Sequence, residues 1–152
     1  METFGLWGNY PTRIDEKGRL KIPVPFKREL ETTYGEEGEF CVTSLDGLYA
    51  RIYPMAEWTK IVEKVSRNLS FHETAEKFLD RTNYYGQIVQ WDQQGRLLIP
   101  PVLRQVAEMK GEVAVLGNVT WLKVWNNQRF LSDISGNPWT PEDKRFLNEL
   151  KI

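Results

Sequence analysis

Residues 15–23 read DEKGRLKIP and residues 92–100 read DQQGRLLIP, so six of nine positions are identical at a separation of 77 residues. Each stretch leads into a short amphipathic segment with a proline near its start, Pro25 in the first and Pro101 in the second. Proline is favoured in the first turn of a helix, where its missing N–H costs nothing. Two segments rich in β-branched and aromatic residues follow in each copy. The chain is therefore predicted to contain two copies of strand, charged turn, strand, short helix, strand, turn and strand.

The region between the copies has a helical pattern instead. Pro54 or a neighbour is expected to start a first helix, and a second is expected to begin at Ser70 with Glu73 completing a capping box. The apolar face of this second helix is predicted to hold Phe71, Ala75, Phe78 and Leu79. We expect four parts in the chain: a first copy (1–54), a helical insert (55–83), a second copy (84–130) and a C-terminal linker and helix (131–152).

The C-terminal part has no counterpart in the first copy by sequence. Its segment SDISGNP, residues 132–138, has the composition of a linker. The run Thr140-Pro141-Glu142-Asp143 predicts the start of a final helix that buries Phe146, Leu147 and Leu150.

Composition excludes several classes of protein. The 152 residues carry a net charge of −1 and a single cysteine, Cys41, so no disulfide within the chain and no cysteine-rich metal site can form. No apolar run approaches the length of a membrane span, and the N-terminus lacks the pattern of a secretory signal. We expect a cytoplasmic protein that binds no membrane, metal, cofactor or small-molecule substrate. Carboxylates are scattered and His72 is the only histidine, so no enzyme motif is present and we expect no catalytic residue.

The repeated turn has a physical explanation. Asp15 favours the start of a turn because its carboxylate accepts local backbone N–H groups, and Gly18 supplies the positive φ that closes a short loop. Side chains alternate along a strand, so Arg19 is expected to point away from the buried face that Leu20 and Ile22 share. The same reasoning places Arg96 opposite Leu97 and Ile99. Each Asp–Arg pair is close enough to form an ion pair, so one alternative is a purely structural, salt-bridged turn.

Cations gather around the first turn, and a repeated arginine suits phosphates and guanine edges. The second turn has fewer cations, so we expect Arg19→Ala to weaken DNA binding more than Arg96→Ala. The candidate DNA-binding residues are Arg13, Asp15, Lys17, Arg19, Lys21, Asp92 and Arg96.

Three longer stretches extend the pattern: FGLWGNYPTRIDEKGRLKIP near the start, YPMAEW in the middle and WDQQGRLLIPPVLRQVA in the second half. With these stretches the chain resembles the MraZ family over roughly residues 4–130. The resemblance implies a mostly β fold with helices (α+β), in which two tandem AbrB-like swapped-hairpin β-α-β modules form one pseudo-twofold barrel. The segment beyond about residue 131 lies outside the shared pattern.

The resemblance also implies a function. Members of the family are cytoplasmic, nucleoid-associated repressors that bind short promoter repeats in double-stranded DNA upstream of the division and cell-wall gene cluster. They assemble into rings, and the Asp-x-x-x-Arg turns are implicated in DNA contact, which here means Asp15 with Arg19 and Asp92 with Arg96. Two alternatives stay open: an antitoxin-like protein-interaction module that grips a partner through residues 131–152, and a ring-forming scaffold without DNA binding.

Overall fold

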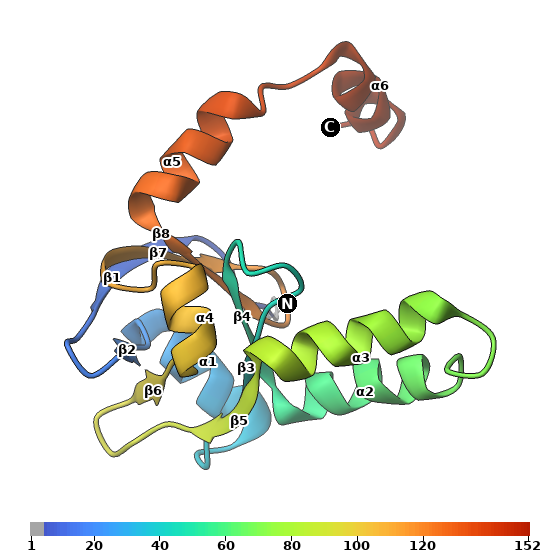
Figure 1. Ribbon diagram of the computed structural model, residues 1–152. Helices are drawn as coiled ribbons and strands as arrows, with labels where there is room; N and C mark the ends of the chain where they lie inside the picture. The colour runs from blue at the N-terminus through green and yellow to red at the C-terminus, as the bar shows by residue number, and fades with distance from the viewer. Residues whose placement is uncertain (1–4) are drawn as a thin grey trace.

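The two copies fold into matching sets of elements in the computed structural model, which describes residues 5–152 (Figure 1). The first copy forms β1 (Asn9–Ile14), β2 (Arg19–Lys21), α1 (Val24–Tyr34), β3 (Glu39–Thr43) and β4 (Ala50–Pro54). The second copy forms β5 (Gln87–Gln90), β6 (Arg96–Leu98), α4 (Pro101–Val106), β7 (Gly111–Gly117) and β8 (Leu122–Asn126). This order of elements is the one that the sequence predicts for each copy.

The strands of the two copies interleave in one antiparallel sheet of order β5-β3-β4-β8-β7-β1-β2-β6, which nearly closes into a barrel. The first strand of each copy pairs with the third strand of the other: β1 with β7, and β5 with β3. Two further pairs, β2 with β6 and β4 with β8, join equivalent strands. The predicted fold, two AbrB-like copies sharing one barrel, is confirmed.

The registers of the β2–β6 and β4–β8 pairs, which join equivalent strands, locate the pseudo-twofold axis. Leu20 lies opposite its counterpart Leu97 in the β2–β6 pair, and Arg51 lies opposite its counterpart Lys123 in the β4–β8 pair. In the order of strands the two pairs lie on opposite sides of the barrel. Leu20 and Leu97 are fully buried, so both copies contribute to one hydrophobic core. Neither copy could bury this surface alone.

Helices α1 and α4 begin directly after the Ile-Pro pairs, with Pro23 and Pro100 as their N-cap residues. Pro25 and Pro101 lie in the first helical turn, as predicted. Proline fixes φ near the helical value, so these residues end the second strand of each copy and start the helix that covers the barrel.

The insert forms a helical arm, with α2 (Met55–Ser66) and α3 (Glu73–Tyr85) lying side by side and projecting from the barrel (Figure 1). The predicted start at Pro54 is confirmed, since this residue is the N-cap of α2. The start predicted for the second helix is wrong: its N-cap is His72, without a side-chain capping hydrogen bond. Phe71 therefore precedes the helix, and it is 79% exposed instead of part of the apolar face.

The linker predicted at residues 132–138 is also wrong, because α5 (Asn127–Gly136) runs through most of it. Asn126 caps this helix by accepting a hydrogen bond from the Arg129 N–H at 3.2 Å. Helix α5 begins 72 residues after α2, which is also the offset between Trp58 and Phe130. The two helices are therefore counterparts, and the repeat reaches further than the sequence indicates.

The final helix, α6 (Pro141–Glu149), has the capping box that Thr140 and Asp143 predict. Its predicted burial is wrong, since Phe146 is 59% and Leu150 53% exposed. Figure 1 shows why: α5 and α6 extend away from the barrel, which leaves most of the apolar face of α6 uncovered within residues 5–152.

Candidate nucleic-acid interface

The first charged turn is held together by one carboxylate. Asp15 Oδ1 accepts hydrogen bonds from the backbone N–H groups of Lys17 and Arg19, both at 2.9 Å. Asp15 Oδ2 accepts a hydrogen bond from Arg19 Nε at 2.8 Å. Gly18 closes the loop with a φ of 83°, in the left-handed region that favours glycine. One aspartate thus shapes the backbone and orients the arginine at the same time.

The second turn repeats this arrangement. Asp92 Oδ1 accepts hydrogen bonds from the N–H groups of Gln94 at 2.9 Å and Arg96 at 3.0 Å, and its Oδ2 accepts one from Arg96 Nε at 2.8 Å. Gly95 has a φ of 74°. The two ion pairs that the sequence predicts are therefore present, and the structural role of both aspartates is real.

The barrel places the two turns side by side. The N–H of Ile22 donates to the carbonyl of Gly95 at 3.0 Å, and the N–H of Ile99 donates to the carbonyl of Gly18 at 2.9 Å. Arg96 consequently reaches towards both aspartates, with its Nη1 3.9 Å from Asp15 Oδ2. The side chains of Arg19 and Arg96 are 31% and 25% exposed, so neither arginine is sealed inside the barrel.

Hydrogen bonds within each turn lower the pKa of its aspartate. The N–H of Arg19 holds the pKa of Asp15 below its ordinary value of 3.8, although desolvation opposes this shift, and the Arg19 side chain lowers the pKa further. The N–H and side chain of Arg96 act in the same way on the pKa of Asp92. Both carboxylates are therefore ionised at neutral pH, and each offsets part of the charge of its arginine.

Two helix cations join the turns, and sequence reasoning did not select them. A methyl group on Gly18 would overlap the Arg104 guanidinium, and one on Gly95 would lie 2.9 Å from the Cδ and Cε atoms of Lys27. Each turn is thus covered by a basic side chain of the other copy. Lys27 and Arg104 are themselves 77 residues apart, so aligning the copies one helical turn further would have found them.

The remaining candidates lie at different distances from this centre. Lys21 lies directly opposite Arg96 in the β2–β6 pair, and its side chain is exposed. Lys17 is exposed at the tip of the first turn. Arg13 lies further out on β1, where it lines an open cavity of about 760 Å³ together with Asp15, Arg104 and other residues. The candidates therefore form one surface, with Arg13 at its flank.

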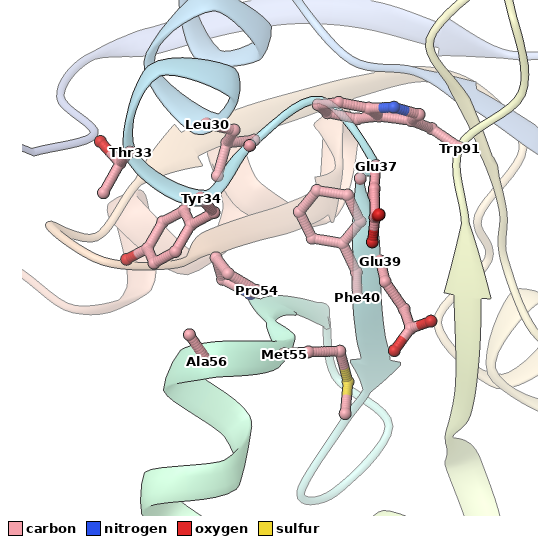
Figure 2. A pocket seen from close by; sticks show the side chains of 12 residues that line it. Leu30, Thr33, Tyr34, Glu37, Glu39, Phe40, Pro54, Met55, Ala56 and Trp91 are labelled. Atoms are coloured by element: carbon pink, nitrogen blue, oxygen red, sulfur yellow. The ribbon is translucent and has the colours of Figure 1, made fainter.

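A second cavity, of about 380 Å³, lies between α1 and the start of α2 (Figure 2). Figure 2 shows Tyr34, Phe40 and Trp91 on its wall, with the carboxylates of Glu37 and Glu39 at one side. No lysine or arginine lines it, so its charge is wrong for a phosphate.

Metal ligation and membrane insertion find no support in the part of the chain that the structure describes. Within residues 5–152, no three His, Cys, Asp or Glu side chains come together as potential metal ligands. In the same range, the helices are too short or too polar to cross a bilayer. His72 is an exposed residue at the start of α3.

Comparison with known proteins gives one family. Residues 6–81 and 87–137 match the family model of the MraZ protein, which its description also calls antitoxin-like. A protein of Acidobacterium capsulatum named transcriptional regulator MraZ is 46% identical over 145 residues, which is 95% of this chain and 98% of that protein. One of Koribacter versatilis with the same name is 48% identical over 145 residues, with the same coverage of both chains. One of Thermus thermophilus is 32% identical over 143 residues, or 90% of this chain and 94% of that protein.

Proposed function

This chain belongs to the MraZ family, and we propose that it is a transcriptional regulator that binds double-stranded DNA through its two charged turns. The observation that carries the proposal is the juxtaposition of the turns. Two arginines from distant parts of the sequence emerge side by side from one rigid surface, each oriented by an aspartate.

The shape of this surface suits duplex DNA. A two-stranded β ribbon fits the major groove, where an arginine can donate two hydrogen bonds to guanine. Arg19 uses its Nε to bind Asp15, and its terminal nitrogens have no hydrogen-bond partner within residues 5–152. Those nitrogens can then donate to a base edge or a phosphate. The proposed DNA-binding residues are Arg13, Asp15, Lys17, Arg19, Lys21, Asp92 and Arg96.

Lys27 and Arg104 extend the proposal to the phosphate backbone. Each lies over the glycine in the turn of the other copy. Phosphate contacts orient a protein on the duplex, whereas contacts to bases supply specificity. Lys27 already binds Glu31 at 2.7 Å, so Arg104 is the stronger candidate of the two.

A chain with net charge −1 gains little from long-range attraction to DNA, so several turns must act together. We propose a ring-like homo-oligomer whose turns bind successive short promoter repeats, because linked sites add by effective concentration. The proposed target is the division and cell-wall gene cluster, and the proposed effect is repression. The protein would act in the cytoplasm, on the nucleoid, without a cofactor, small-molecule substrate or catalytic role.

One observation favours a second candidate function, protein binding. Helices α5 and α6 expose Leu131, Ile134, Phe146 and Leu150, each by more than half. An antitoxin-like module could grip a partner with this segment. A ring-forming scaffold without DNA binding would also use such a surface between subunits.

The decisive experiment is a gel shift of the whole chain on the duplex upstream of its own gene, at several salt concentrations. Contacts to phosphates predict that affinity falls steeply as salt rises, with a slope of about 0.9 per contact. Arg19→Gln is expected to weaken the complex, whereas Lys144→Gln on the distant α6 should not. Retention on the duplex that is insensitive to both salt and Arg19→Gln would contradict the proposal.

A further inference from the structure

A second symmetric cluster lies across the barrel from the turns. The β4–β8 pair alternates along both strands: Ala50, Ile52, Leu122 and Val124 point into the core. The residues between and beside them share the outer face. This outer cluster consists of Tyr49, Arg51, Tyr53, Trp121, Lys123 and Trp125.

Two cations lie at the centre of this outer cluster, on the pseudo-twofold axis. Arg51 and Lys123 are directly opposite each other in the strand pair. Within residues 5–152, neither forms a salt bridge with a carboxylate. Like charges that face each other across two strands repel, so this arrangement lacks a counter-charge.

Aromatic rings fix both cations in place. Arg51 donates hydrogen bonds from Nη1 to the Tyr53 hydroxyl at 2.9 Å and from Nη2 to the Tyr49 hydroxyl at 3.0 Å. Its guanidinium lies 4.8 Å from the centre of the Trp121 ring. Lys123 Nζ lies 5.4 Å from the ring centre of Tyr49 and 5.7 Å from that of Trp121.

The aromatic rings of the outer cluster also stack on one another. Tyr49 stacks on Trp125 at 4.8 Å and Tyr53 stacks on Trp121 at 4.9 Å, as the pseudo-symmetry requires. Tyr53 and Trp125 are buried, because Trp58 of α2 covers the first and Phe130 of α5 covers the second. The two cations therefore lie on a layer of stacked aromatic rings, between α2 and α5.

We propose that Arg51 and Lys123 form a binding site for a dianionic phosphate, such as a phosphate monoester. The two cations match a ligand of about two negative charges, whereas a carboxylate would neutralise one of them. Arginine offers further N–H donors in a fixed plane, and the Lys123 ammonium offers three donors that can turn towards the ligand. The cations themselves occupy the faces of Tyr49 and Trp121, so the site takes the phosphate group and leaves no ring free to stack on a base.

The position of the site separates it from the proposed DNA contact. The β4–β8 pair lies opposite the β2–β6 pair in the barrel, so a duplex held by the turns of one subunit does not reach Lys123 of the same subunit. The source of the phosphate is then a free ligand. DNA bound directly at the outer cluster is the competing source.

Calorimetric titration of the whole chain with inorganic phosphate tests the site, with sodium chloride at matched ionic strength and acetate as background titrations. Phosphate is expected to bind and acetate to bind far more weakly. Lys123→Gln should weaken phosphate binding about tenfold or more, the scale of one lost charged hydrogen bond. Lys123→Arg should keep most of the affinity. Lys144→Gln, which leaves both the outer cluster and the turns intact, should bind phosphate like the unmodified chain.

An NMR titration of the unmodified chain guards against variants that fail to fold. Phosphate should shift the indole N–H signal of Trp121, which lies beside both cations, and leave that of the distant Trp139 unchanged. Three results would overturn the proposal: no phosphate binding, equal binding by Lys123→Gln, or loss of phosphate binding in Arg19→Gln instead. A loss of DNA affinity in Lys123→Gln without any phosphate binding would show that the cluster contacts DNA.

Discussion

The two arginines of the turns should contribute unequally to DNA binding. Arg19 has one carboxylate partner, Asp15 at 2.8 Å, and its terminal nitrogens donate no hydrogen bond within residues 5–152. Arg96 has Asp92 at 2.8 Å and a second carboxylate, Asp15, at 3.9 Å from its Nη1. The charge of Arg96 is therefore more completely offset before DNA arrives.

In the proposed complex, removing Arg19 would delete one charged hydrogen bond to DNA, which is worth about 1.5–3 kcal/mol. Arg19→Ala is thus expected to raise the Kd roughly 10- to 150-fold. Arg96→Ala should cost about 1 kcal/mol, or roughly fivefold, because its Nη1 already lies near the carboxylate of Asp15. If Arg19 contacts a phosphate, its loss should also lower the salt slope by about 0.9.

Fluorescence anisotropy with a labelled promoter duplex, at two or more salt concentrations, measures all of these quantities. Lys144→Ala is the matched control, since it removes one exposed cation far from the turns, and circular dichroism shows whether each variant is folded. Equal losses for the two arginine variants, or a larger loss for Arg96→Ala, would refute the reasoning from carboxylate contacts.

Three other outcomes follow from the structure. The lowered pKa values of Asp15 and Asp92 stabilise the fold above the ordinary value of 3.8, and this contribution disappears as the pH falls below it; the unfolding midpoint of Asp92→Asn should therefore drop less between pH about 6 and about 3 than that of the unmodified chain. Burial raises the pKa of the Cys41 thiol to about 12, so a thiol reagent should not label the folded protein near pH about 8.5, and rapid labelling without denaturant would show that the site opens. Thr140→Ala removes the cap of α6, and it should lower the helix signal while leaving the unfolding midpoint of the barrel unchanged, because α6 lies away from the barrel (Figure 1).

Local patterns predicted the repeated core of the fold well. Asp15 and Gly18 encode their turn within a few residues, so the hairpin, the outward-facing and partly exposed Arg19 and the buried Leu20 could be derived from sequence. The capping box at Thr140 is equally local. Such features depend on the backbone chemistry of neighbouring residues, and both copies confirm them.

Features that depend on tertiary contacts were harder to predict. The polar composition of residues 132–138 indicated a linker, but the cap at Asn126 and the packing of Phe130 on Trp125 start a helix there. Phe146 looked like a core residue because an apolar helical face normally finds a partner, and this one does not. The cations Lys27 and Arg104 reach the turns only through the exchange of strands between the copies.

Because both copies of the repeat lie on one chain, the two sides of the pseudo-twofold axis need not be identical. In a true homodimer every substitution appears on both sides, and such a protein matches inverted DNA sequences. Here the first turn carries Lys17 and the second carries Gln94 at the equivalent position, so the two turns differ in charge. In the proposed complex, each subunit would therefore have a polarity along the double helix. A row of such subunits would favour target sequences arranged head to tail, all read in one direction, over palindromes.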